Sequence, residues 1–91
     1  MPMNEIIGII EGTVRERFGS QISSVRVARG TDYDGDDIFR VTVVFDGDAP
    51  LDAHKTSGIV RHTRHKLLAR NERAFPIFDF VSKADAGAEA A

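Results

Sequence analysis

Residues 25–45 read VRVARGTDYDGDDIFRVTVVF, and this stretch predicts a β-hairpin. Apolar and polar residues alternate over residues 25–29, and residues 38–45 are rich in β-branched and aromatic side chains; both patterns are typical of strands. Between them lies a short segment of Asp and Gly, the residue types that form tight turns. The hairpin is therefore the element around which the rest of the chain can be placed.

The register of this hairpin depends on which residues must face the core. A two-residue turn at Asp34 and Gly35 would put the valines of the first strand on the same face as Arg40 and Thr42. A three-residue loop, residues 33–35, with Gly35 in the left-handed conformation keeps the apolar side chains together. It predicts the core-facing pairs Val25 with Val43 and Val27 with Val41, with Phe39 and Phe45 on the same face. The opposite face then carries Arg26, Ala28, Arg40 and Thr42.

A first helix is expected before the hairpin. Asn4 is a suitable N-cap, and apolar residues recur at helical spacing until Gly19, which can supply a left-handed C-terminal residue. Gly8 and Gly12 inside this helix each cost about 1 kcal/mol relative to Ala. We interpret them as residues that permit a close approach to the sheet, and a close contact with another helix is the alternative.

A second helix is expected from Asp52, a plausible N-cap, to about Arg70, with Asn71 as a stop signal and Gly58 as a weak point within it. At about 100° per residue, one stripe of this helix is apolar enough to be buried. It comprises Thr56, Val60, Thr63 and Leu67, flanked by Ile59 and Leu68.

Residues 75–82 form the last expected strand, in which Pro76 favours an edge or strand-opening position and Phe78 and Phe80 are assigned to the core. The predicted order is α-β-β-α-β. The fold class is α+β, a two-layer sandwich in which two helices cover one face of a three-stranded sheet. Residues 1–83 make up this single domain, and residues 84–91 are expected to be a disordered tail.

Composition and charge exclude several classes of function. The 91 residues are 42% apolar and 29% charged, with a net charge of −2 and a pI of about 5.8, so no global positive field attracts nucleic acid or an anionic membrane. The absence of cysteine excludes disulfides, thiol nucleophiles and zinc ribbons. No apolar run reaches the roughly 18 residues of a membrane span, and a signal-peptide pattern is lacking. We expect a cytoplasmic protein without a membrane partner.

The sheet face opposite the helices is expected to stay uncovered. Its side chains would be Ile38, Val44, Ile77 and Val81 among Arg26, Arg40, Thr42 and Asp79. Such a mixed surface suits a dimer or partner contact, and a solvated sheet face is the alternative.

Acidic residues crowd the hairpin turn. Their alternation resembles the opening of a calcium loop, in which hard oxygen ligands surround a hard cation. However, Asp37 stands where that loop requires Gly, and Val43 stands where it requires a bidentate Glu. We therefore assign no metal and expect a solvated turn that uses these residues for its geometry. The cluster comprises Asp32, Asp34, Asp36 and Asp37.

Three histidines, His54, His62 and His65, fall on one arc of the second helix, opposite its apolar stripe. His54 and His65 would be about 16 Å apart, too far to share a metal. His62 and His65 could chelate with a third ligand, but the sequence identifies none. We expect an exposed, solvent-facing or partner-facing helix and no cofactor.

Charge is segregated along the chain. Seven aspartates lie between Thr31 and Ala53, whereas the second helix has five cations and no acid. A basic helix could bind phosphate backbones, or it could contact the acidic turn of another copy or of a different protein. The five cations are Lys55, Arg61, Arg64, Lys66 and Arg70.

Several short motifs together suggest a family. They are Asp32-Tyr33-Asp34-Gly35-Asp36, Leu51-Asp52, Ser57-Gly58, Val60-Arg61, Phe75-Pro76 and Phe80-Val81-Ser82-Lys83. In this combination the chain resembles a family of short bacterial proteins, without an established activity, that are encoded beside a small helical protein of HEPN type in a toxin-antitoxin-like arrangement. The resemblance implies a protein partner.

A second resemblance rests on residues 39–45 followed by Arg61-His62 and Leu67-Leu68. In these residues the chain is similar to BolA-like proteins, which share the strand and helix order of type II KH folds. It departs from them in a longer connection before Arg61 and in having Phe75-Pro76 where that family places a His-Ala pair. A GxxG loop for RNA binding is also absent.

These observations favour a binding module over an enzyme. The first hypothesis is a protein-interaction module, acting as a homodimer or with another small protein. Its candidate contact residues are Arg61, His62 and His65 on the second helix and Arg26, Arg40 and Val44 on the open sheet face. The alternative is a nucleic-acid-binding domain that uses Lys55, Arg61, Arg64, Lys66 and Arg70.

Overall fold

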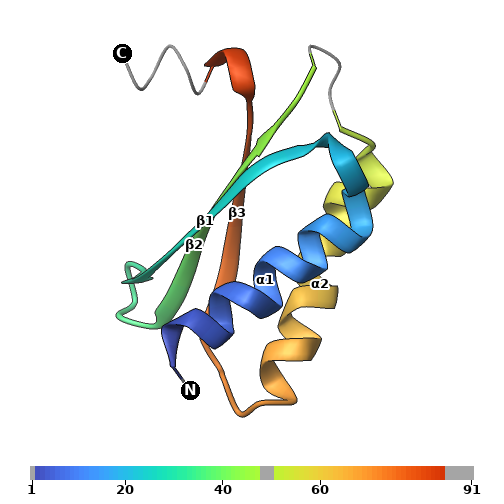
Figure 1. Ribbon diagram of the computed structural model, residues 1–91. Coiled ribbons are helices and arrows are strands. Elements are labelled where there is room, and N and C mark those ends of the chain that lie inside the picture. Colours follow the sequence, from blue (N-terminus) through green and yellow to red (C-terminus); the bar gives the residue numbers. More distant parts are fainter. Residues whose placement is uncertain (1, 48–50, 86–91) are drawn as a thin grey trace.

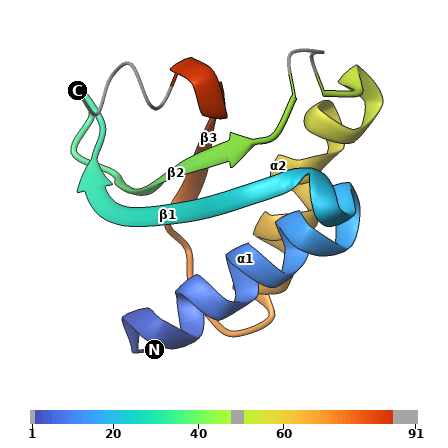
Figure 2. The ribbon, with the colours of Figure 1, turned by 45° about the horizontal axis from the view of Figure 1, so that its top comes forward.

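The computed structural model describes residues 2–47 and 51–85 of the chain, which form two layers (Figure 1). The strands form one sheet of order β1-β2-β3, and both helices cover the same face of it (Figures 1 and 2). The predicted α+β class and the order of elements are therefore confirmed. Along the chain come α1 (Met3–Phe18), a short 3₁₀ turn η1 (Gly19–Gln21), β1 (Ile22–Thr31), β2 (Asp37–Phe45), α2 (Ala53–Leu68) and β3 (Phe75–Ser82).

The hairpin of β1 and β2 has the predicted register. Val25 lies opposite Val43 and Val27 opposite Val41. Gly35 has a φ of 84°, the left-handed conformation that ends the three-residue loop. The first strand is longer than the predicted residues 25–29, because pairing continues to both ends of the hairpin.

β3 is an edge strand, as the position of Pro76 suggested, and it pairs parallel to β2. Phe78 and Phe80 face the helices and pack against the core, which confirms their assignment. The ring of Phe80 meets the ring of Phe18 edge to face, with centroids 5.7 Å apart. The last strand therefore contacts the end of the first helix.

The core lies between the helical layer and the sheet. One buried polar group, the hydroxyl of Thr63, is fully enclosed and has no hydrogen-bond partner among the described residues. The buried apolar cluster comprises Ile6, Ile10, Val14, Phe18, Ile22, Phe39, Val41, Val43, Phe45, Ile59, Leu67 and Ala74.

The start of α1 differs from the prediction. Pro2 occupies the N-cap position with extended backbone, and its carbonyl accepts from the N–H groups of Glu5 at 3.1 Å and Ile6 at 3.3 Å. Asn4 lies inside the first turn, so its assignment as N-cap is wrong. Proline fixes φ near the value found at this N-cap position, and the helix begins two residues earlier than predicted.

The two glycines of α1 have a different role from the one predicted. A Cβ at Gly8 or Gly12 would meet no atom within 4 Å, and both residues are exposed. They line a shallow hollow between α1 and α2, beside Lys66 and Arg70. Close approach to the sheet therefore does not explain them, and neither does a tight helix contact.

The ends of α2 follow the prediction, but its buried stripe is rotated. Asp52 caps the helix by accepting from the N–H of His54 at 2.8 Å, and Asn71 has a left-handed φ of 62° just beyond its end. Of the six residues predicted to be buried or flanking, Val60 is half-buried and Leu68 is 46% exposed. α2 contacts the edge strand β3, and within residues 2–47 and 51–85 no further strand lies beyond β3. The buried residues of α2 are Ile59, Thr63 and Leu67.

Arg17 joins the end of α1 to the first turn of α2. Its Nε donates to the carbonyl of Lys55 at 2.7 Å, and its Nη2 donates to the carbonyl of His54 at 3.2 Å. A Cβ at Gly58 would overlap this guanidinium. Gly58, which is a weak point of the helix by its propensity, therefore leaves the space that the Arg17 guanidinium occupies.

The predicted disordered tail, residues 84–91, falls mostly outside the described residues. Ala84 and Asp85 belong to a helical turn that begins at Lys83. Over the described ranges, no helix combines the length and the hydropathy needed to cross a bilayer.

Candidate interaction surfaces

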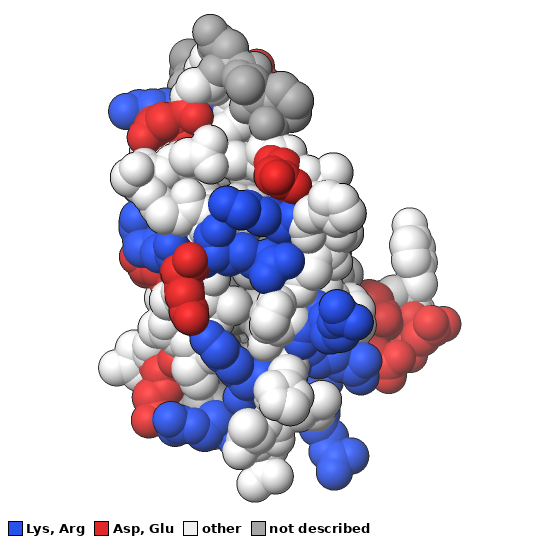
Figure 3. Space-filling view, turned by 90° about the vertical axis from the view of Figure 1, so that its right-hand side faces the viewer, with Lys and Arg blue, Asp and Glu red and all other residues white. Residues whose placement is uncertain are grey.

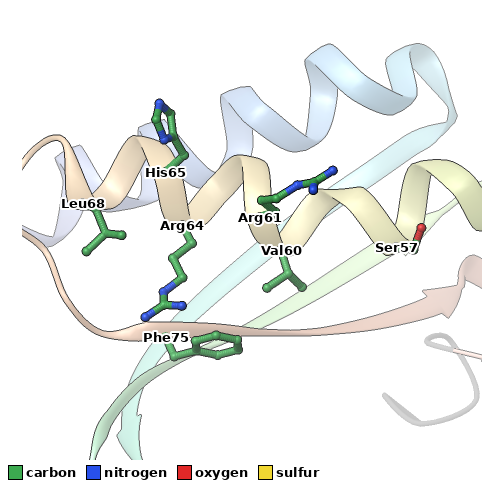
Figure 4. Close-up of a pocket in the computed structure, with 7 residues that line it drawn as sticks. All are labelled: Ser57, Val60, Arg61, Arg64, His65, Leu68 and Phe75. Atoms are coloured by element: carbon green, nitrogen blue, oxygen red, sulfur yellow. The ribbon is translucent and has the colours of Figure 1, made fainter.

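The most distinctive surface is a groove between α2 and the start of β3, which we call the α2 groove (Figure 4). Val60, Arg64 and Leu68 point from the helix towards the strand, where the ring of Phe75 lies (Figure 4). The groove has a volume of about 440 Å³. Its lining residues are Ser57, Val60, Arg61, Arg64, His65, Leu68 and Phe75.

The apolar part of the groove is exposed because α2 lies over the edge of the sheet. Leu68 is 46% exposed and Phe75 is 41% exposed, although both are large apolar side chains. The guanidinium carbon of Arg64 lies 5.1 Å from the centroid of the Phe75 ring, a cation–π distance. An apolar floor is thus combined with a fixed positive charge.

The charge of the groove is not neutralised by neighbours. α2 contains no acidic residue, and none lines the groove. In the described part of the chain, Lys66 pairs with Glu16 at 3.2 Å, whereas Arg61 and Arg64 form no ion pair. Lysine and arginine side chains gather across the middle of the face in Figure 3, with acidic side chains beside and between them. The two groove arginines are therefore available to an external anion.

The three histidines are all exposed, as predicted, but they do not share one surface. His65 lines the α2 groove, whereas His62 lines a hollow between α1 and α2 together with Glu16 and Arg17. The candidate contact set on this helix is therefore divided. Arg61 and His65 belong to the α2 groove, and His62 belongs to the seam between the helices.

The five cations of the nucleic-acid hypothesis are also divided. Arg61 and Arg64 line the α2 groove, whereas Lys66 and Arg70 line the hollow beside Gly8 and Gly12. The backbone carbonyl of Lys55 is bound by Arg17 in the first turn. The basic residues thus surround the helix instead of forming a single row.

The open sheet face lies on the opposite side of the sheet from α2 and carries the other three candidate contact residues. Arg26 shares a cross-strand row with Thr42 and Asp79, and Arg40 lies between Ala28 and Ile77. Val44 is half-buried, between Ser24 and Val81. The structure therefore places Arg26, Arg40 and Val44 together and separates them from Arg61, His62 and His65.

The exposure of Ile38 differs from the prediction for the open face. It points to that side but is only 2% exposed. A Cβ at the neighbouring Gly30 would lie 3.8 Å from both Arg40 Nε and Ile38 Cγ1, so both side chains reach towards the glycine. Together with Tyr33 and Ile77, these residues line a hollow at the base of the hairpin tip. The hairpin itself thus shields Ile38, which was predicted to be part of the uncovered surface.

The hairpin tip uses one aspartate to build the turn. Asp32 Oδ1 accepts from the N–H groups of Asp34 and Asp36, each at 2.9 Å, and the N–H of Asp32 donates to the carbonyl of Asp36 at 3.0 Å. Carboxylate oxygens of these three residues lie within 4.8 Å of one another. The loop's own hydrogen bonds account for the position of Asp32, as expected for aspartates that shape a turn. The side chain of Tyr33 projects from this tip and is fully exposed.

Glu72 forms a joint between the α2–β3 connection and β1. Arg29 Nη2 donates to Glu72 Oε1 at 2.7 Å, and the N–H of Ala74 donates to the other carboxylate oxygen at 3.2 Å. The hydrogen bond from Arg29 is the main cause of a pKa for Glu72 below its ordinary value of 4.5; burial opposes the shift, and backbone N–H groups add to it. Arg29 also lies over the ring of Phe39, at 4.7 Å from its centroid. This pair has a structural role.

The groove floor was not anticipated from the sequence. The pairs Ile59-Val60 and Leu67-Leu68 contain its signal, because adjacent residues on a helix point about 100° apart and cannot both face the core. In each pair the first residue is buried and the second lines the α2 groove. Phe75 completes the floor from a different element.

No protein-family model matches the chain, and no functionally described protein is found to be similar to it in sequence. Among solved structures, the fold is similar to a chain of CzrB, for which a role as a zinc transporter has been proposed. The TM-score is 0.53 and the sequence identity 13%, with 91% of this chain and 98% of that chain covered. The likeness concerns the fold.

Proposed function

We propose that this chain is a non-enzymatic protein-interaction module and that the α2 groove is its contact surface. The observation that carries the proposal is the combination, in one groove, of exposed Leu68 and Phe75 with two arginines that have no carboxylate partner in the described chain. Arginine and aromatic residues are enriched where protein interfaces gain most of their binding energy.

The chemistry of the groove defines the partner that it fits. An apolar or aromatic side chain can cover Val60, Leu68 and Phe75, while flanking carboxylates can meet Arg61 and Arg64. A bidentate contact between carboxylate and guanidinium also fixes orientation. The preferred partner is therefore a protein segment in which an aromatic or aliphatic residue lies beside acids.

The resemblance to proteins encoded beside a HEPN-type helical protein supports a protein partner as well. In a toxin-antitoxin-like pair, a small module of this kind would bind its neighbour's product and control it by contact. A homodimer is the other form of the same proposal, since it uses the same groove.

Nucleic-acid binding is the second candidate function, and the five cations on and just after α2 favour it. Its distinguishing property is salt dependence, because each phosphate contact releases counterions. Titration of fluorescein-labelled duplex DNA and single-stranded RNA, followed by anisotropy at several salt concentrations, tests it directly. Binding that weakens steeply with salt and is lost when Arg61 and Arg64 are reversed would favour this function over the first.

The experiment that tests the proposal compares the two faces of the molecule. The wild-type chain, an Arg61→Glu, Arg64→Glu variant and an Arg26→Glu, Arg40→Glu variant are purified by affinity tag from the native host after nuclease treatment. The two variants carry the same change of charge, but on opposite sides of the sheet. Circular dichroism shows that each variant is folded.

We expect the wild-type and open-face variants to retain the same protein, or to self-associate equally, and the groove variant to lose that property. Loss in the open-face variant alone would move the contact surface to Arg26, Arg40 and Val44. A wild-type chain that retains no protein and sediments as a monomer at every concentration would overturn the proposal.

A further inference from the structure

The hairpin tip of this same chain has the properties of a ligand for the α2 groove. Tyr33 is fully exposed, and acids flank it on both sides. The turn that presents it is fixed by left-handed Gly35 and by the two hydrogen bonds that Asp32 Oδ1 accepts. Because a fixed turn has little conformational entropy to lose on binding, the tip is preorganised.

We propose that the occupant of the α2 groove is the hairpin tip of a second copy of the chain. This inference rests on the proposed function and names its partner. Tyr33 of one copy covers the floor of the groove formed by Val60, Leu68 and Phe75 of the other copy. The carboxylates of Asp34 and Asp36 meet the guanidinium groups of Arg61 and Arg64 at the rim.

Charge complementarity within one molecule is the main argument for self-association. The tip carries four aspartates over six residues, whereas α2 carries Lys55, Arg61, Arg64 and Lys66 and no acid. The whole chain has a net charge of only −2, so repulsion between copies is small and local attraction decides the encounter.

The positions of the two surfaces favour a closed dimer. Phe75, in the groove floor, pairs in register with Ile38, which lines the hollow below Tyr33. Tip and groove therefore lie near the same end of β3. In a two-fold dimer each tip enters the other copy's groove, and no binding site is left open, whereas a head-to-tail contact would continue into a filament.

The test is sedimentation analysis of the full chain at low salt, with charge reversals on either side of the contact. The groove variant is Arg61→Glu, Arg64→Glu, and the tip variant is Asp34→Arg, Asp36→Arg, which keeps Asp32 to form the turn. A Tyr33→Ala variant tests the anchor. The Arg26→Glu, Arg40→Glu variant, on the open sheet face, is the control.

We expect the wild type and the control to dimerise with rising concentration. Each of the three other variants should have a dissociation constant about tenfold higher or more, as close charge pairs and buried aromatic anchors require. An equimolar mixture of groove and tip variants should form a heterodimer, because the reversed tip meets the reversed groove and the remaining contact is unchanged.

A wild-type chain that stays monomeric, or a mixture of reversed variants that does not pair, overturns the inference. If the wild type is monomeric but its groove retains a different protein or a nucleic acid, the occupant was identified wrongly while the groove is still a binding site. If groove and control variants behave alike in both experiments, the proposed function fails with it.

Discussion

Replacing Gly58 with alanine has two opposite effects on the free energy of unfolding: it improves helix propensity, and it displaces the side chain of Arg17. Alanine is about 1 kcal/mol more favourable than glycine inside a helix. However, the new Cβ would overlap the Arg17 guanidinium, which donates to the carbonyls of His54 and Lys55. Displacing it removes two hydrogen bonds from a charged donor.

The size of this loss follows from the setting of Arg17. A hydrogen bond to a charged group contributes about 1.5–3 kcal/mol and a neutral one about 0.5–1.5 kcal/mol; these two bonds are accessible to solvent, which reduces each to about 0.5 kcal/mol. Their loss costs about 1 kcal/mol in total. In the wild-type chain, Gly58→Ala should therefore change the free energy of unfolding by less than about 0.5 kcal/mol.

In an Arg17→Ala background nothing remains to be displaced, and the same substitution should stabilise the chain by about 1 kcal/mol. Urea denaturation followed by far-ultraviolet circular dichroism measures all four chains of this cycle. Gly8→Ala is the matched control, since a Cβ there meets no atom and should stabilise equally in both backgrounds. A Gly58→Ala change as stabilising as Gly8→Ala in the wild-type chain would refute the reasoning.

Three further predictions concern the core and the Glu72 joint, and denaturant titration measures each of them. Leu67→Ala should lower the free energy of unfolding by about 2–4 kcal/mol, whereas Leu68→Ala, in the half-exposed groove, should cost less than about 1 kcal/mol; equal costs would contradict the rotated stripe. Thr63→Val should stabilise the chain by about 1 kcal/mol, because the buried hydroxyl has no partner among the described residues. The lowered pKa of Glu72 means that its pair with Arg29 stabilises the fold above the unfolded-state pKa and that this contribution is lost as the pH falls below about 4.5. Glu72→Gln should therefore be less stable than the wild type at neutral pH, with the difference shrinking in acid, and a constant difference would count against the pair.

The hairpin could be predicted from the sequence because its information is local. Two requirements left one loop length: the valines of both strands had to share a face, and the loop needed a residue in the left-handed conformation. Residues 25–45 contain the information for both. The edge position of β3 followed from Pro76 for a similar reason. These features depend on neighbours within a few residues.

The buried arc of α2 could not be predicted in the same way. A helix pattern shows which residues are apolar, but the width and edge of the sheet below decide which of them are covered. α2 contacts the edge strand, so Val60 and Leu68 reach beyond the region where a strand could bury them. The groove floor joins these residues to Phe75, which lies in a strand brought back by a parallel crossover. Ile38 was misplaced because its burial depends on the direction that the Arg40 side chain takes towards Gly30, and a strand pattern does not show that direction.

The contact between Phe80 and Phe18 joins residues far apart in the sequence, which affects how the chain folds during its synthesis. Phe18 is made early and Phe80 late, so the nascent polypeptide exposes the apolar side of α1 and of the hairpin until β3 emerges. β1 and β2 can pair locally, but β3 must return in parallel across α2, which is a slower step. A premature stop codon before Phe75 would leave this surface without its last strand. Such a fragment would be a substrate for chaperones and proteases.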